Sequence, residues 1–264
     1  MNTIVSRSER TLSVHMEHEL LHNLEKAGLS AKLAQQIIEA RDNVLAIKLV
    51  RWLQESCYEP TPVRVAQKIM GRLYGLNTAH QLGHVEMLGL RHNPNFIPES
   101  LMEVPFNQET LAELSESHIL VAVFPTSIKK MVKHYGPGLI RSDRQPQMDY
   151  DSVTLASAPE WHLIRKSPEP DTYRQIWTIQ LGRLLGKPVA IPDLHTMVYA
   201  MISYFLEEAE RLFPNCLVNC THSEHTNRVM SVGMFLNDGI EITSPPNITD
   251  WRAGGIATER KKHT

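Results

Sequence analysis

The sequence predicts an α+β protein, with a helical N-terminal region followed by a mixed domain that ends in an antiparallel sheet. In the first part of the chain, apolar residues recur near every third or fourth position, which is the spacing of helices. Toward the C-terminus they alternate with polar residues, which is typical of half-buried strands. Between these parts, strand-like segments flank two helical segments, and this order indicates an α+β architecture.

Length and composition are those of a globular protein. The chain has 264 residues, of which 42% are hydrophobic and 21% charged, so wholesale disorder is excluded. The net charge of −2 includes no basic excess that would indicate nucleic acid or an anionic membrane as partner. Three cysteines do not make a disulfide framework, and the polar N-terminus lacks the apolar run of a signal peptide. We therefore expect a cytoplasmic protein, and no apolar stretch is long enough to span a bilayer.

Residues 1–90 are expected to be helical. Leucine and valine spacing predicts a first helix over 10–26, which Gly28 would end. Ser30 would cap a second helix over 31–54, so that the two helices form a tight hairpin. Their amphipathic faces suggest that this region mediates homo-oligomerisation or attachment.

Proline and glycine divide the segment that follows. Pro62 is well placed as the first residue of a third helix, which would end near residues 71–75. Another short helix would follow Asn77. Prolines, a glycine and polar residues then predict a linker with a short helix over 91–115.

The remaining residues, 116–264, are expected to form the mixed domain. An apolar run predicts a buried strand over 118–125, and a region rich in proline, serine and aspartate predicts a long loop over 136–160. Asn237-Asp238-Gly239 is the strongest hairpin signal in the chain. The other predicted elements are a strand at 161–166, helices at 172–185 and 192–213, and strands at 217–220, 228–235, 240–243 and 256–260.

Cysteine and histidine spacing raises the alternative of a metal-dependent hydrolase. Zinc-type ligands lie within ten residues at Cys216, Cys220, His222 and His225, and three of them would share one face of a strand. Structural zinc sites usually take ligand pairs from two separate segments, which favours buried cysteines and exposed histidines here. We therefore expect no cofactor, with zinc as the alternative.

Signatures of other enzyme classes are weak or missing. His80 and His84 have the spacing of a zincin helix, but the glutamate general base is replaced by the residues Gln-Leu-Gly. The chain contains no G-x-S-x-G elbow, no Walker A loop and no G-x-G-x-x-G fingerprint. A non-enzymatic function is therefore favoured.

A DNA-binding regulator is a further alternative. Residues 61–91 contain two short helical segments around Gly75, the arrangement expected of a helix-turn-helix. The segment carries Arg64, Lys68 and Arg72, but its basic excess is small. Nucleic acid is therefore not the expected partner.

The segment 233–260 has the composition of a recognition surface. It contains a hairpin, a proline-containing loop and the pair Trp251-Arg252, among many asparagine, aspartate, serine and threonine residues. Such loops combine adaptable hydrogen bonding with one or two anchoring side chains. An ordinary surface loop has the same composition, so both interpretations stay open on the residues alone.

Several longer segments resemble a group of uncharacterised bacterial proteins. These segments are KAGLSAKLAQQIIEARDN at 26–43, HILVAVFP at 118–125, EWHLIRKSPEPDT at 160–172, MVYAMISYFLEEAERLF at 197–213, NRVMSVGMF at 227–235 and DWRAGGIATERK at 250–261. The C-terminal part of that group is similar to the C-type-lectin-like (formylglycine-generating-enzyme-like) domains used as variable proteins of diversity-generating retroelements. The resemblance covers most of the chain.

The resemblance implies a C-type-lectin-like domain over 116–264 that acts as an adaptable binding scaffold without catalysis. Its frame would consist of Val232, Gly233, Gly255, Arg260 and Lys261. The partner would be a protein or a small ligand. The expected contact residues, with Trp251 as aromatic anchor and Arg252 as charged donor, are Phe235, Asn237, Asp238, Glu241, Thr243, Asn247, Asp250, Trp251 and Arg252.

Overall fold

The computed structural model of the chain divides into two compact units, Met1–Cys57 and Tyr58–Thr264. The structure describes residues 18, 19, 22, 26, 29–39, 44, 60–82, 97–141, 158–223, 226–243 and 254–262. In the first unit, helix α2 (Ala31–Glu39) follows Ser30, whose Oγ accepts a hydrogen bond from the Leu33 N–H at 3.2 Å. This N-cap confirms the predicted helix start. The helix predicted over 10–26 lies almost wholly outside the described residues.

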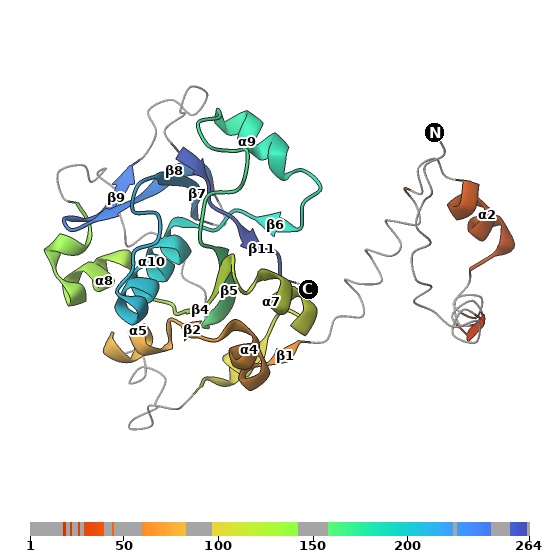
Figure 1. Cartoon of the computed structure of the whole chain (residues 1–264), viewed down its shortest axis with the longest axis horizontal. Coiled ribbons are helices and arrows are strands. Elements are labelled where there is room, and N and C mark those ends of the chain that lie inside the picture. Colours follow the sequence, from red (N-terminus) through yellow and green to blue (C-terminus); the bar gives the residue numbers. More distant parts are fainter. Residues whose placement is uncertain are drawn as a thin grey trace, which may run out of the picture. The chain divides into compact units, whose positions relative to one another are not determined.

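One sheet of the second unit has five strands in the order β2-β4-β5-β11-β6 (Figure 1). They are β2 (Leu73–Tyr74), β4 (His118–Val123), β5 (Glu160–Arg165), β11 (Glu259–Arg260) and β6 (Val189–Ala190). Strand β4 is buried along its whole length and confirms the strand predicted over 118–125. It pairs in parallel with β2 and antiparallel with β5. Its continuous apolar sequence follows from this burial on both faces.

Residues 60–82 belong to this second unit. Strand β2 pairs Leu73 with Leu120 and Tyr74 with Val121, so a two-residue strand joins the segment to the central strand of the sheet. The sequence pattern had predicted this segment as part of the helical region 1–90. The pairing is decided by β4, which lies more than forty residues further along the chain.

Helices α4 (Val63–Met70) and α5 (Leu76–Gln81) lie on either side of β2 in the sequence. Pro62 is the N-cap of α4, with φ −54° and ψ 136°, so its prediction as the first helical residue is wrong by one position. The reason is that Pro62 also belongs to strand β1 (Thr61–Pro62), which pairs with β3 (Glu103–Val104) and holds its backbone extended.

The other sheet has four strands in the order β10-β7-β8-β9. They are β10 (Gly254–Ile256), β7 (Leu217–Ser223), β8 (Thr226–Leu236) and β9 (Gly239–Thr243). Strands β7, β8 and β9 are antiparallel, whereas β10 pairs in parallel with β7. The C-terminal sheet is therefore mixed. Tight hairpins force antiparallel neighbours, while the longer connection 244–253 allows β10 to return in the same direction as β7.

The strand predicted over 256–260 is divided between the two sheets. Strand β10 ends at Ile256 in the four-stranded sheet, and β11 begins at Glu259 in the five-stranded sheet. Between them, the Thr258 carbonyl accepts a hydrogen bond from Arg165 N at 3.1 Å. The C-terminal segment thus connects the two sheets directly.

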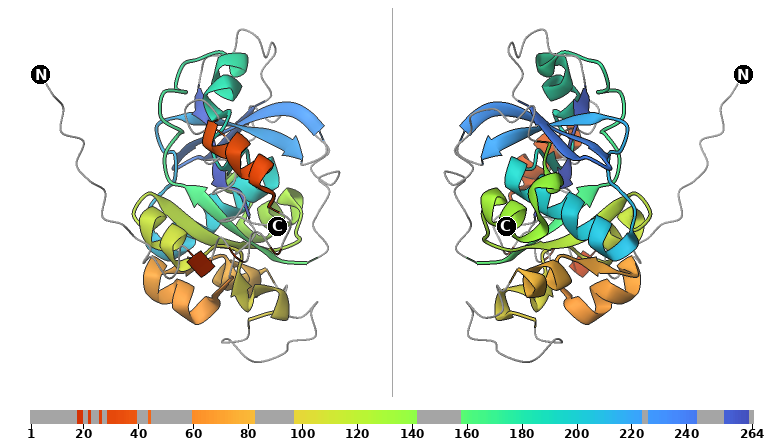
Figure 2. Two further views of the ribbon diagram at one scale, coloured as in Figure 1. Left: turned by 90° about the vertical axis from the view of Figure 1, so that its right-hand side faces the viewer. Right: turned by 90° about the vertical axis from the view of Figure 1, so that its left-hand side faces the viewer.

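Helix α10 (Leu194–Glu208) is the core helix of the second unit. Asp193 caps it by accepting a hydrogen bond from Thr196 N on Oδ1 at 2.7 Å, and residues 194–203 are all buried. The helix contacts strands of both sheets and lies in the middle of the unit (Figures 1 and 2). This burial explains why its first three turns are apolar on nearly every side. It ends at Ala209, which has a left-handed φ of 57°, earlier than the predicted end at 213.

The remaining helices cover the sheets and their edges. Helices α7 (Gln108–Leu114) and α9 (Trp177–Leu184) lie within the ranges predicted for them, and Asn107 caps α7. Helix α8 (Ile128–Tyr135) was not predicted, although Ile128, Met131, Val132 and Tyr135 have the spacing of an apolar helix face. Short 3-10 turns, η2 (Glu99–Leu101) and η3 (Pro137–Leu139), precede β3 and follow α8.

Candidate functional site

The β8–β9 hairpin is the part of the predicted recognition surface that the structure describes most fully. Leu236 pairs with Gly239, so Asn237 and Asp238 form the exposed turn, as their sequence predicted. Gly239 has a φ of 109°, and a Cβ there would lie 2.5 Å from the Gly138 carbonyl oxygen. The turn therefore lies against the backbone of η3, and only glycine fits at its last position.

A bulge in β8 sets the direction of the side chains next to this turn. Met234 and Phe235 together lie opposite Ile240, and Met234 has a φ of 40°. Met234 N donates a hydrogen bond to the Cys216 carbonyl at 2.9 Å, which holds the bulge against the start of β7. A bulge bends the strand and redirects its side chains. Phe235 is turned inward, only 4% exposed, with its ring edge-on to Phe205 at a centroid distance of 5.2 Å.

An open hollow of about 680 Å³ lies beside the hairpin. It is lined by the segment that follows α10 and by the hairpin, with Ala209, Glu210, Arg211, Pro214, Phe235, Leu236, Asn237 and Asp238. The Arg211 guanidinium lies over the rings of Phe205 and Phe235, at 4.9 and 5.5 Å from their centroids. Arg211 Nε is buried without a hydrogen-bond partner among the described residues. The hollow is thus lined by an arginine whose guanidinium makes cation–π contacts with two phenylalanine rings.

Arg141 holds the hairpin to the rest of the unit. Its Nη2 lies 2.6 Å from Asp238 Oδ2 and its Nη1 lies 3.0 Å from Glu241 Oε2. Its backbone N–H also donates to the Ile240 carbonyl at 3.1 Å. Glu241 is 3% exposed, so it lies inside the domain and not on the surface where the sequence placed it. The predicted contact residue Asp238 is exposed but already paired with Arg141.

The other predicted contact residues follow β9. Thr243 is half-buried at the end of that strand, whereas Asn247, Asp250, Trp251 and Arg252 lie outside the described residues. What the structure does describe is where their segment starts and ends. Strands β9 and β10 lie at opposite edges of the four-stranded sheet, so residues 244–253 connect one edge to the other.

A buried polar network fixes the strand at which this segment ends. Gln180 donates from Nε2 to the carbonyls of Thr172 and Gly254, both at 2.9 Å. Its Oε1 accepts from Asn219 at 2.8 Å, and Asn219 in turn accepts from the Ser231 hydroxyl at 2.6 Å. The chain of bonds ties β10, β7 and β8 to α9. Because every member has a partner, the network stabilises a single arrangement of this edge.

Glycines of the proposed frame allow backbones to approach closely. A Cβ on Gly233 would lie 2.2 Å from the Cys216 carbonyl oxygen, and one on Gly255 would lie 2.5 Å from Pro168 Cβ. Gly254 is equally constrained, with the Leu217 carbonyl oxygen at 2.1 Å. These positions have no room for a side chain.

The structure describes the metal-ligand candidates only in part. Cys220 is buried and Cys216 half-buried, and burial raises the pKa of both thiols. The side chain of His222 and all of His225 lie outside the described residues, as does His84. Among the residues that are described, no group of three or more histidine, cysteine or acidic side chains has the geometry to hold a metal ion.

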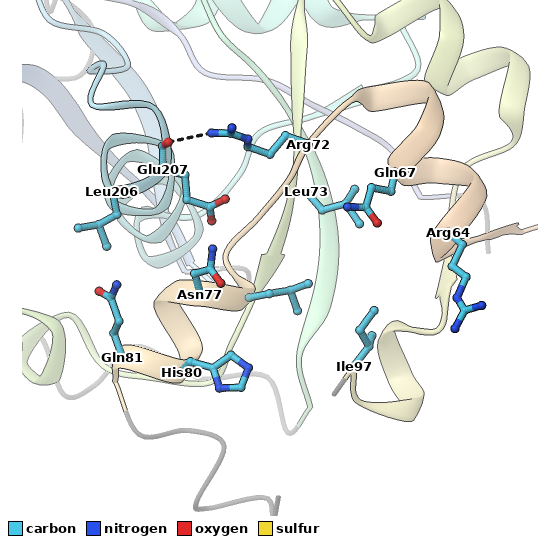
Figure 3. A pocket seen from close by; sticks show the side chains of 11 residues that line it. Arg64, Gln67, Arg72, Leu73, Asn77, His80, Gln81, Ile97, Leu206 and Glu207 are labelled. Atoms are coloured by element: carbon cyan, nitrogen blue, oxygen red, sulfur yellow. Dashed lines mark hydrogen bonds between the residues drawn. The ribbon is translucent and has the colours of Figure 1, made fainter. Parts of the chain in front are cut away.

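A second concavity lies in the segment for which a helix-turn-helix is the alternative interpretation. Helices α4 and α5 are joined there through strand β2, which is part of the five-stranded sheet. Together with the end of α10 they line an open groove of about 990 Å³ (Figure 3). Arg64, Arg72 and His80 are among its lining residues.

Sequence reasoning did not identify Arg141 or Arg211. Arg141 lies within the loop predicted over 136–160, and Arg211 within the last turn of the helix predicted over 192–213. Each has a partner that is distant in sequence, since Asp238 lies 97 residues after Arg141 and Phe235 lies 24 residues after Arg211. No local pattern signals such contacts.

No family model, no curated protein and no solved structure matches the chain. None of the helices that the structure describes is both long enough and apolar enough to cross a membrane.

Proposed function

We propose that this protein is a non-enzymatic recognition module, and that its C-terminal region is a C-type-lectin-like scaffold similar to the variable proteins of diversity-generating retroelements. The ligand, a protein or a small molecule, would bind across the β8–β9 hairpin, the hollow beside it and residues 244–252. Trp251 would be the aromatic anchor and Arg252 the charged donor.

The positions of Thr243 and Gly254, the described residues on either side of 244–253, carry the proposal. The segment leaves one edge of the four-stranded sheet at Thr243 and rejoins the opposite edge at Gly254. Both ends belong to strands held by buried contacts, namely the Arg141 pair at β9 and the Gln180 network at β10. Binding residues are commonly carried by connections that a rigid scaffold positions.

Residues of the β8–β9 hairpin and of the hollow beside it also support the proposed ligand-binding surface. Asn237 offers an exposed amide, and Arg211 offers a cation over two aromatic rings. Arginine and aromatic side chains at the centre of an interface supply most of its binding free energy. The surface therefore combines adaptable polar groups with anchoring ones.

The test is a search for binders followed by a comparison of variants. The full chain is probed against a phage-displayed random peptide library and against a glycan array, and the Kd of each binder is measured. Trp251→Ala should weaken binding by about tenfold or more, the effect of losing an interface anchor. Met102→Ala, which truncates a 53% exposed apolar side chain elsewhere, is the matched control and should bind normally.

Circular dichroism and thermal unfolding should be unchanged in both variants. The proposal fails if neither library yields a binder, or if Trp251→Ala binds as tightly as the wild type.

A further inference from the structure

The groove between α4, α5 and the end of α10 is a second concave surface, separate from the hairpin. Its volume, about 990 Å³, is at the upper end of the range for ligand sites. Side chains spaced three or four residues apart share a helix face, which places Arg64 and Gln67 together on α4. In the same way Asn77, His80 and Gln81 share one face of α5, on the other side of the groove (Figure 3).

The groove contains cationic donors that the fold does not use. Arg64 makes no hydrogen bond or ion pair with any described residue. Arg72 uses Nη1 for both of its contacts, with the Glu207 carbonyl oxygen at 2.8 Å and Glu208 Oε1 at 2.9 Å. These contacts orient the guanidinium, and neither Nε nor Nη2 makes a further contact with a described residue, so both can donate to a ligand.

The carboxylates near the groove are engaged with the protein. Glu207 Oε1 accepts from Gly75 N at 3.3 Å, and burial raises the pKa of this carboxyl group. Glu208 accepts from the Tyr74 hydroxyl at 2.7 Å and pairs with Arg72. Neither group therefore opposes an incoming acid as strongly as a free surface carboxylate would.

The remaining lining residues match a peptide better than a bare anion. Gln67, Asn77 and Gln81 line the groove with amides, which both donate and accept, as peptide groups do. Gln81 already accepts from the Tyr135 hydroxyl at 3.1 Å, which orients its amide so that the NH₂ group can donate. Leu76, Ile97 and Leu206 form an apolar part of the lining. An anion alone would use none of these acceptors or apolar contacts.

We propose that this groove binds an extended peptide segment that carries acidic side chains and an apolar one. Arg64 and Arg72 pair with its carboxylates, the amide side chains hydrogen-bond its backbone, and an aliphatic side chain packs on Leu76, Ile97 and Leu206. Guanidinium groups suit carboxylates because their planar donors match the two oxygens. The site is independent of the hairpin surface and of the ligand proposed for it.

Fluorescence anisotropy tests the proposal with two labelled peptides and the full chain. The acidic probe has the sequence Glu-Leu-Asp-Leu-Glu, and its matched neutral partner is Gln-Leu-Asn-Leu-Gln. The acidic peptide should bind about tenfold more tightly at low salt, and its affinity should fall as salt is added. Equal binding of the two peptides, or no binding of either, overturns the proposal.

Charge-neutralising variants locate the binding. Arg64→Gln and Arg72→Gln should each weaken the acidic peptide about three- to tenfold, as expected for loss of one interfacial charge pair. Arg183→Gln removes an exposed arginine from α9, outside the groove, and is the matched control. If Arg64→Gln and Arg183→Gln bind alike, the groove is not the site.

Competition separates a peptide site from a small-anion site. Unlabelled acidic peptide should displace the probe, whereas inorganic phosphate or phenyl phosphate at the same concentration should not. Displacement by either phosphate at that concentration would show a small-anion site and overturn the peptide assignment.

Discussion

The hairpin and the α4–α5 groove both contain arginines, but the two regions use them differently. At the hairpin, Arg141 pairs with Asp238 in the turn and with the buried Glu241 in β9. Its guanidinium therefore binds the hairpin to the segment that follows η3. In the groove, Arg64 pairs with no described residue. Arg72 contacts described residues through Nη1 alone, so its Nε and Nη2 can donate to a ligand. An arginine whose donors are all oriented by the fold stabilises a scaffold, while one with unused donors can select a ligand.

Glycine-to-alanine substitutions in the hairpin region and next to the groove should differ most in the free energy of unfolding that they cost. Gly233→Ala forces a Cβ to within 2.2 Å of a carbonyl oxygen at the hairpin bulge, so it should lower the free energy of unfolding by about 4 kcal/mol. Gly71→Ala next to the groove is the matched control. Gly71 has a φ of 76° but nothing within 4 Å of its Cβ position, so only about 1 kcal/mol should be lost.

Urea unfolding of both variants measures this contrast. Similar losses for the two glycines would show that backbone conformation, and not the close approach of β8 to β7, limits the hairpin region.

Acid should destabilise the second unit, because two of its buried histidines resist protonation in the folded state. Burial, assisted by Arg165, lowers the pKa of His118 to about 4, and burial also lowers the pKa of His195. Between pH 6.5 and 4 the unfolded chain binds a proton that folded His118 does not. Stability is therefore complete above pH 6.5 and falls by up to about 3 kcal/mol as the pH approaches 4.

Unfolding curves at pH 7, 6, 5 and 4 test this expectation, with His118→Asn as the variant that should flatten the profile. If the free energy of unfolding of His118→Asn falls with pH as steeply as that of the wild type, other groups cause the loss of stability in acid. The same curves define the pH range in which peptide binding can be compared.

Removing the arginine of the hairpin should have an intermediate effect. Arg141→Gln takes away a partner of the buried Glu241 carboxylate, so it should cost about 2 kcal/mol of unfolding free energy. Part of this loss should return in the double variant Arg141→Gln/Glu241→Gln, because the buried charge is then gone as well. A double variant less stable than either single one would contradict the pairing as the cause.

The smallest effect on stability is expected in the groove. Arg64→Gln should change the free energy of unfolding by less than about 0.5 kcal/mol, since the side chain is exposed and makes no ion pair with described residues. Combined with its expected loss of peptide binding, this would make Arg64 a recognition residue. A loss as large as that of Arg141→Gln would instead assign Arg64 to the scaffold, and would remove the distinction between the two regions.

Local chemistry was sufficient for several elements of the fold. Ser30, Asn107 and Asp193 begin helices as cap residues do, because their side chains satisfy backbone N–H groups that lie within the next three residues. The Asn237-Asp238-Gly239 turn has its predicted position for the same reason, since a tight hairpin depends on adjacent residues. The apolar run at 118–123 is likewise readable as a buried strand.

Pairing partners were decided by distant parts of the chain. Strand β2 is two residues long and has no pattern of its own, and it exists because β4 offers it a partner. The direction of β10 and the division of 254–260 between two sheets follow from Leu217 and Ile164, which lie in other strands. Neither could be predicted from neighbouring residues.

The sequence by itself determined the α+β class, the helix caps, the central strand and the hairpin turn, because each depends on interactions between residues a few positions apart. Only the tertiary structure decided that Glu241 is buried beside Arg141, that Arg211 lies over two phenylalanine rings, and that Arg64 has no partner among the described residues. Whether a charge stabilises the fold or faces a ligand depends on which groups packing brings within reach of it. Glu241 lies 100 residues after Arg141 and Phe235 lies 24 residues after Arg211, and these distances are set only when the sheets and helices assemble.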